Sequence, residues 1–161
     1  MRRMIDILVV LTAALLLAGV SWRWHRDTEL DRRLDAARAS VEVIEKQIHL
    51  QSALERTEMS PSGYPMTIQP AWFADGPPMN PLLDDGRPWM EIADETERRR
   101  EHPPDPIALD RDDAQFWYNP HTGRVRARIP ATISDAKALR WYNRINDASL
   151  ANLFVTDAET P

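Results

Sequence analysis

The stretch that decides the fold lies near the N-terminus and reads Met4-Ile-Asp-Ile-Leu-Val-Val-Leu-Thr-Ala-Ala-Leu-Leu-Leu-Ala-Gly-Val-Ser-Trp22. Residues 7–20 carry no charge. As a helix rising about 1.5 Å per residue, the whole stretch spans roughly 28 Å, close to the ~30 Å hydrocarbon core of a bilayer. Arg2 and Arg3 precede it, and Trp22-Arg-Trp-His-Arg26 follows it as an interfacial belt would. The sequence therefore predicts a transmembrane helix over residues 4–22, with the lipid bilayer as its first partner.

Two questions about this segment stay open in the sequence. A cleaved signal peptide is the rival interpretation, because Met-Arg-Arg before an apolar run is how such peptides begin. Ala18-Gly-Val20 is a poor small-x-small cleavage site, which favours a retained anchor. Arginines flank both ends, so the positive-inside rule does not assign an orientation.

A regular apolar spacing continues beyond the anchor. Neither Pro nor Gly occurs between Val20 and Met59, which predicts one helix from about residue 4 to about 57, ended by Ser60-Pro-Ser-Gly63. Its apolar positions recur at intervals of 4, 3, 4, 3 and 4 residues, a heptad seam. The seam either pairs with partner helices or packs on the chain's own C-terminal domain, and its short length favours the second. Its residues are Leu30, Leu34, Ala37, Val41, Ile44 and Ile48.

Composition excludes several classes of function. The 161-residue chain has a net charge of −5, whereas nucleic-acid binding needs a basic surface. It contains no cysteine, so disulfides, thiolate zinc sites and cysteine nucleophiles are ruled out. No phosphate-binding glycine loop, HExxH or G-x-S-x-G motif occurs, and the four histidines are scattered. The sequence therefore predicts a protein that is not an enzyme, has no cofactor and takes no small-molecule substrate.

Loop carboxylates are the only candidate metal ligands. Asp84-Asp85 and the group Asp110, Asp112 and Asp113 offer oxygen atoms of the kind that calcium prefers. Solvated loop charge is the commoner explanation of such runs, so no metal site is predicted.

A proline-rich segment follows the predicted helix. Residues 61–106 hold 10 of the 13 prolines, which predicts loops and turns with one short helix around Glu91–Arg100. Trp72, Phe73 and Trp89 interrupt the segment and indicate a loop held on a surface. An aromatic groove that docks a peptide is the less favoured interpretation.

A β-hairpin is predicted in the C-terminal third. Residues 115–119 and 124–129 read as two strands joined across Asn119-Pro-His-Thr-Gly123, where Gly123 allows a left-handed turn. Strict alternation puts Val125, Ala127 and Ile129 inward and the intervening arginines outward. This outward row is either a solvated face or a surface for an acidic partner. Its residues are Arg124, Arg126 and Arg128.

The rest of the chain completes the predicted architecture. Ser134 or Asp135 caps a final helix that ends near Asp147, and residues 150–155 add a short strand. The expected fold is α+β, a long helix packed on a small domain with an antiparallel hairpin and a C-terminal helix. Its parts are a tip (1–3), the membrane helix (4–22), a helical extension (23–58) and the small domain (59–161).

Two motifs resemble a known family. Arg3-Met-Ile-Asp-Ile-Leu-Val-Val10 is similar to the N-terminus of type IV pilins and type II secretion pseudopilins, with Asp6 at the family's acidic position inside the membrane. Gly63-Tyr-Pro65 resembles the Gly-x-Tyr-Pro segment of major pseudopilins. The family's Gly-Phe cleavage site has no counterpart, because Met1 and Arg2 stand at those two positions.

The resemblance implies a location and a role. It implies a single-pass protein of the bacterial inner membrane, with a cytoplasmic tip and a periplasmic C-terminal domain. It further implies a structural or accessory role in a secretion or pilus-like assembly, with copies of itself or other pilin-like subunits as partners. A membrane-tethered module that docks another envelope protein is the alternative.

Overall fold

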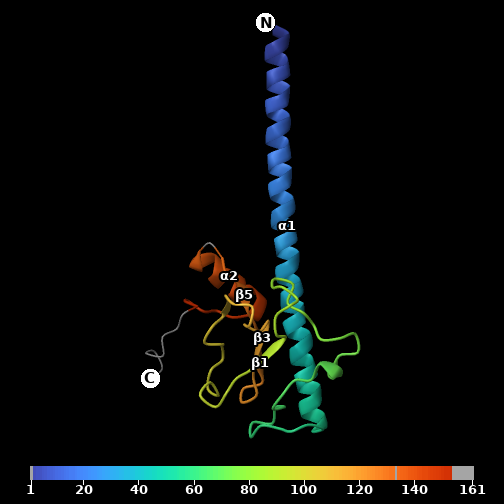
Figure 1. The fold of residues 1–161 in the computed structure, drawn as a ribbon, viewed down its shortest axis with the longest axis vertical. Coiled ribbons are helices and arrows are strands. Elements are labelled where there is room, and N and C mark those ends of the chain that lie inside the picture. Colours follow the sequence, from blue (N-terminus) through green and yellow to red (C-terminus); the bar gives the residue numbers. More distant parts are fainter. Residues whose placement is uncertain (1, 133, 154–161) are drawn as a thin grey trace. The chain divides into compact units, whose positions relative to one another are not determined.

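A computed structural model describes the backbone of residues 2–132 and 134–153, and the side chains of Trp22, Arg26 and residues 28–132 and 134–153 (Figure 1). It divides into two compact units, residues 1–33 and residues 34–161. The second unit has an α+β fold, in which the end of a long helix packs on two small sheets and a C-terminal helix. Because this unit begins at Leu34, it includes much of the segment predicted to be a separate helical extension.

The first element is the helix α1, Arg2–Leu54. It ends three residues before the predicted position, where Glu55 takes a left-handed conformation (φ 49°) and its N–H donates to the Gln51 carbonyl at 3.0 Å. Among the residues that could be searched, no helix has the length and apolarity to cross a bilayer. The predicted membrane segment, residues 4–22, lies outside the described side chains except for Trp22.

The predicted seam of α1 lies in the interior of the second unit. Five of its six positions are at most 4% exposed, whereas Leu30 lies in the first unit. The seam therefore packs on the chain's own domain, the interpretation that the short length favoured, and burial of this apolar face stabilises the fold. The buried positions are Leu34, Ala37, Val41, Ile44 and Ile48.

The hairpin is confirmed, with a second strand that ends two residues earlier than predicted. Strands β3, Phe116–Asn119, and β4, Arg124–Ala127, pair antiparallel, with Phe116 opposite Ala127 and Asn119 opposite Arg124. Gly123 has φ +69° in the connecting turn, as predicted. A Cβ at Gly123 would also collide with the ring of Tyr64, so the turn needs glycine for space as well as for conformation.

A third strand replaces the short helix predicted at Glu91–Arg100. Strand β1, Met90–Ile92, pairs parallel to β3, and the Ala93 N–H extends the ladder to the Tyr118 carbonyl at 2.8 Å. After it the chain turns, and the Asp94 carboxylate accepts from the Thr96 N–H at 2.7 Å. The helix prediction was wrong because pairing with a buried strand outweighs the local helix propensity of Glu and Arg.

The remaining elements close the unit. Strands β2, Ile107–Ala108, and β5, Ile129–Pro130, form a second, parallel pair, and a short 3₁₀ helix covers Pro70–Trp72. Helix α2, Asp135–Asn146, begins where the Ser134 side chain accepts from the Lys137 N–H, which confirms the predicted cap. Residues 150–153 form no strand, and the rest of the predicted terminal strand lies outside the described residues.

Candidate functional site

The three arginines of the hairpin do not share an exposed face. Arg124 is exposed, but Arg126 is only 7% exposed and Arg128 only 3%. The predicted outward row is therefore wrong for two of its three members. The physical reason is that main-chain carbonyls of residues 101–106 cover this side of the hairpin and accept hydrogen bonds from both buried guanidinium groups. Alternation correctly placed the three side chains on one side of the strand, but it could not show what covers that side.

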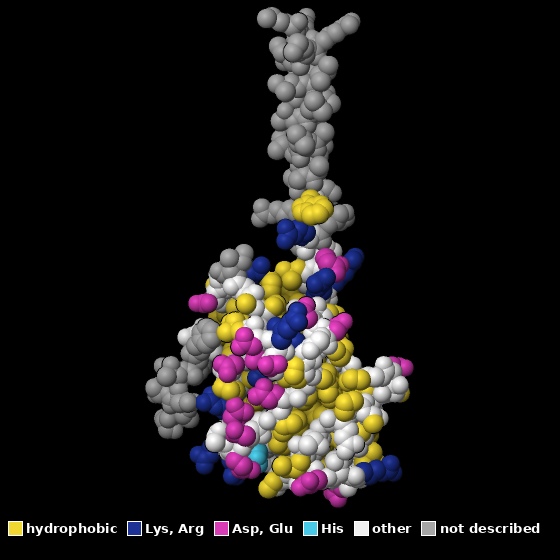
Figure 2. Space-filling model, in the orientation of Figure 1, with side chains coloured by type: hydrophobic (Ala, Val, Ile, Leu, Met, Phe, Trp, Pro, Cys, Tyr) yellow, Lys and Arg dark blue, Asp and Glu magenta, His cyan; other side chains and the backbone are white. Residues whose placement is uncertain are grey.

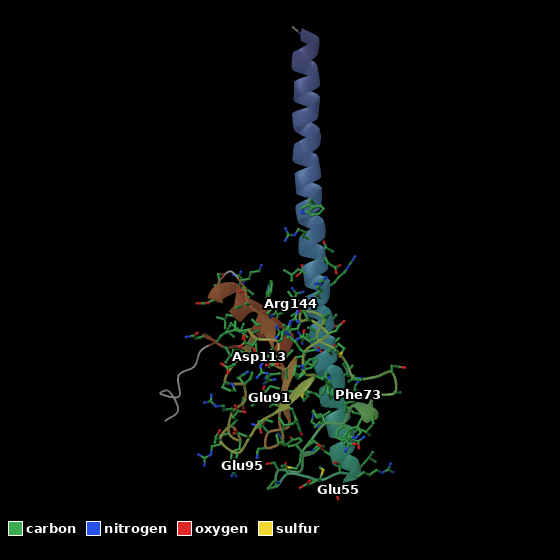
Figure 3. The ribbon with its side chains drawn as sticks, viewed as in Figure 1. Glu55, Phe73, Glu91, Glu95, Asp113 and Arg144 are labelled. Atoms are coloured by element: carbon green, nitrogen blue, oxygen red, sulfur yellow. The ribbon has the colours of Figure 1, made fainter. Side chains whose placement is uncertain are left out.

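Arg128 is a fully paired buried cation. Its Nη1 lies 2.7 Å from the Oε2 of Glu91, a side chain that projects from β1 (Figure 3). Its Nε donates to the Asp105 carbonyl at 2.8 Å, and Nη1 also donates to the Ala114 carbonyl at 3.3 Å. Arg128 thus joins the three-stranded sheet to the segment before β2, and its role is structural.

Arg126 has a different environment. Its Nε donates to the Glu101 carbonyl at 3.1 Å and its Nη1 to the Val125 carbonyl at 3.2 Å. Within the part of the chain that the structure describes, the guanidinium forms no ion pair with a carboxylate. Burial lowers the pKa of Arg126 from its ordinary value, because removal of water disfavours the charged form.

A polar cavity of about 300 Å³ lies beside Arg126. It is lined by side chains that come from α1, the segment before β2, strand β4 and the end of α2, so residues far apart in the sequence meet here. The residues that line it are Glu45, Glu101, His102, Arg124, Arg126, Asn146, Asp147, Ala148 and Ser149.

His102 lines this cavity with a neutral side chain. Its Nδ1 lies 3.1 Å from the hydroxyl of Tyr142, and the two rings are 5.7 Å apart. Burial, followed by the positive charge of Arg126, lowers the pKa of His102 to about 4, so the imidazole is neutral at neutral pH. Burial also raises the pKa of Tyr142, which keeps its hydroxyl protonated.

The side-chain amide of Asn146, which also lines the cavity, is held in place by hydrogen bonds. Its Oδ1 accepts from the Ala127 N–H at 2.7 Å, and its Nδ2 donates to the carbonyls of Ala127 at 3.0 Å and Tyr142 at 3.1 Å. These bonds use the amide to hold α2 on β4. At the rim, Asp147 lies 3.5 Å from Arg38 and is partly neutralised by it.

The other candidate ligands of the sequence do not assemble into a site. Asp113 uses its Oδ2 to accept from the N–H groups of Leu109 and Asp110, both at 2.8 Å, and so shapes its own loop. Asp84 and Asp85 are exposed. Among the described residues no group of three histidine or acidic side chains is placed to hold a metal ion. Asp6, the predicted acidic position in the membrane, lies outside the described side chains.

The Gly63-Tyr-Pro65 motif packs on the hairpin. The ring of Tyr64 lies over Gly123 in the β3–β4 turn, and the Tyr118 hydroxyl donates to the Pro65 carbonyl at 2.7 Å. The chain that leaves α1 is therefore attached to the centre of the sheet. The motif works here as an internal clamp between the helix end and the sheet.

The proline-rich segment is also held in place. Trp89 donates from its Nε1 to the Pro78 carbonyl at 2.7 Å, and its ring meets that of Phe73 edge-on at 5.8 Å. Trp72, Phe73 and Trp89 are all partly buried, which confirms the interpretation of a loop held on a surface.

A second apolar stripe on α1 was missed by the sequence reasoning. Val43, Leu50 and Leu54 are 48%, 51% and 42% exposed, and their spacing of seven and four residues puts them on one face of the helix. Met79 of the proline-rich loop is 38% exposed. In Figure 2 apolar side chains form a broad yellow area over the second unit, beside a region rich in acidic side chains. The spacing was visible in the sequence, but the stronger seam on the same helix concealed it. We call Val43, Leu50 and Leu54 the outer stripe.

Comparison with known proteins gives no assignment: no family model, curated protein or solved structure matches the chain.

Proposed function

We propose that the chain is a non-enzymatic, single-pass protein of a bacterial inner membrane with a structural or accessory role in a secretion or pilus-like assembly. The observation that carries this proposal is the single helix α1, Arg2–Leu54. Its first part has the apolar sequence of a membrane anchor, and its last part supplies a buried seam to a small α+β unit. This division of one helix between anchor and scaffold is what the pseudopilin resemblance implies.

The clamp formed by Gly63-Tyr-Pro65 supports the same proposal. The resemblance rests partly on this motif, and the motif has a defined role in the fold because it fixes the chain after α1 to the hairpin turn. In the proposed orientation residues 1–3 are cytoplasmic and the α+β unit lies outside the cytoplasm.

Lateral contact between copies would use two surfaces. Within the bilayer, Ala13, Ala14, Ala18 and Gly19 offer small side chains for close helix packing, and Asp6 would pair with a neighbouring subunit or with the nearby arginines. Outside it, the buried seam is already occupied by the chain's own domain. Among the described residues that α1 contributes to the second unit, the outer stripe is the apolar face left exposed for a partner.

Single-cysteine crosslinking tests this proposal with a clean background, because the chain has no cysteine of its own. Membranes that contain Leu50→Cys or Val43→Cys should form disulfide-linked dimers on mild oxidation. Leu109→Cys is the matched control, because Leu109 is exposed and apolar (71% exposed) but lies on a loop outside the outer stripe. Equal dimer yields at Leu109 and Leu50, or a chain that alkaline carbonate extracts from the membrane, would contradict the proposal.

The alternative is a membrane-tethered module that binds another envelope protein. The exposed side chain of Met79 on the immobilised proline-rich loop favours it, because this loop offers an apolar contact that does not belong to α1. In that case the same cysteine variants remain monomeric, and Met79→Cys forms a crosslink of a different mass. The pattern of crosslinked masses thus separates the two functions.

A further inference from the structure

We infer that the polar cavity beside Arg126 is a binding site for a carboxylate group. The inference does not rest on the proposed function, because it needs only the α+β unit. It starts from Arg126, a cation that is 7% exposed and forms no ion pair with any described carboxylate. A buried charge without a directly paired counter-ion is costly. Burial lowers the pKa of Arg126 overall and outweighs the nearby carboxylates of Glu45 and Glu101, which act to raise it.

Arg128 provides an internal comparison. It lies two residues away on the same side of the hairpin, is equally buried, and has the ion pair with Glu91 at 2.7 Å that Arg126 lacks. The fold can therefore provide a carboxylate partner for an arginine in this position. At Arg126 the corresponding space is an open cavity of about 300 Å³. That volume accommodates a carboxylate together with the atoms that carry it.

The cavity offers two guanidinium groups to one ligand. Arg124 and Arg126 both line it, the first at its exposed edge and the second in its interior. Guanidinium groups bind carboxylates through paired, charge-assisted hydrogen bonds, which are among the strongest in proteins. The neighbouring amide of Asn146 is already saturated, and His102 is held by Tyr142. The two arginines are thus the main source of binding energy.

The acidic residues around the cavity set its selectivity. Glu45 and Glu101 also line it, and Asp147 at the rim is shared with Arg38. With Asp147 paired to Arg38, the two arginines face two glutamates, so the lining has no excess positive charge and a monoanion fits better than a dianion. A carboxylate is fully a monoanion at neutral pH, whereas inorganic phosphate is a mixture of monoanion and dianion. The carboxylate can belong to a small molecule or to the end of a polypeptide, and the experiment below separates the two.

Nuclear magnetic resonance on the full chain in detergent micelles tests the inference. Acetate is titrated against sodium chloride at constant ionic strength, so that general screening is the same in both series. The guanidinium N–H signals of Arg126 and Arg124 should shift saturably, with a dissociation constant on the order of 10 mM for so small a ligand. The signals of Arg128 should not move, because its guanidinium is already paired.

Three single variants locate the binding. Arg124→Gln removes an exposed cation that lines the cavity and should weaken acetate binding about tenfold. Arg140→Gln removes an exposed cation of α2 that does not line the cavity and should leave binding unchanged. Glu45→Gln should strengthen binding about threefold, because it removes a negative charge that faces the ligand. Equal effects of Arg124→Gln and Arg140→Gln would contradict the inference.

A second series identifies the source of the carboxylate. A short peptide with a free C-terminus is compared with the same peptide amidated at that end. Binding of the free peptide at least tenfold tighter than acetate, and lost on amidation, supports a polypeptide terminus. Comparable binding of acetate and free peptide supports a small-molecule carboxylate. The absence of a saturable shift with either, or phosphate binding tighter than acetate, would overturn the inference.

Discussion

Two regions on the same side of the hairpin show how one residue type can have opposite roles. Around Arg128 the guanidinium has a carboxylate at 2.7 Å and two main-chain carbonyls, so its charge and its donors are used within the fold. Around Arg126 two carbonyls hold the side chain, but no described carboxylate pairs with it and a polar cavity lies beside it. The comparison indicates that the first region contributes to stability, whereas the second keeps a charge available at some cost to stability.

The largest effect is expected from Arg128→Met. The change leaves Glu91 and the carbonyls of Asp105 and Ala114 without their donor, and loss of one partner of a buried ion pair destabilises by about 3 kcal/mol. That figure is at the low end of the range because the Glu91 side chain is 41% exposed and can be rehydrated. Urea unfolding of the full chain in detergent, followed by tryptophan fluorescence, measures it. Arg140→Met, at an exposed position, is the control and should change the free energy of unfolding by less than about 0.5 kcal/mol.

Arg126→Met should have a smaller effect on stability and a larger one on binding. Two carbonyls lose their donor, but the cost of burying an unpaired charge is removed at the same time. We expect a loss of about 1 kcal/mol or less. The same urea experiment measures it, and addition of acetate should stabilise the unsubstituted chain but not the variant. If Arg126→Met were as destabilising as Arg128→Met, the distinction between the two regions would fail.

A third prediction concerns the pH dependence of stability near the cavity. The pKa of His102 in the fold is about 4, below the value of about 6.5 for an exposed histidine. Between these two pH values the unfolded chain binds more protons, so the contribution of His102 is complete above pH 6.5 and is lost as the pH falls towards 4. Because the ring is only partly buried, solvent screening reduces this loss to about 1 kcal/mol.

Urea unfolding at pH 7 and pH 4.5 checks this prediction, with His102→Gln as the control. The variant should show a smaller fall in the free energy of unfolding between the two pH values, and an equal fall would contradict the assignment. The positive charge of Arg126 is one of the two main causes of the shift. Titration of the His102 signal in Arg126→Met should therefore give a pKa closer to 6.5.

Local sequence signals predicted the elements whose formation depends on neighbouring residues. The hairpin follows from an alternating run and a glycine in its turn, and the start of α2 follows from the Ser134 cap. Five of the six seam positions of α1 were also correctly placed, because heptad spacing fixes which side chains share a face. The pseudopilin-like function and the membrane location remain predictions.

Sequence patterns gave wrong predictions, or none, where contacts between distant segments determine the local structure. Residues 91–100 contain good helix formers, yet Met90–Ile92 forms a parallel strand because β3 offers an unpaired edge. No spacing in the sequence relates Glu45, His102, Arg126 and Asn146, so the cavity that they line could not be predicted.

The sequence by itself determined the period of α1, the two strands and turn of the hairpin, and the position of its arginines on one side of the strand. These properties follow from backbone geometry and steric preference, which act over a few residues. Only the tertiary structure decided that residues 101–106 cover that side, that Glu91 reaches Arg128 and that no described carboxylate pairs with Arg126. The physical reason is that burial and charge pairing depend on which distant segments come within a few ångströms, and this is settled only when the core packs.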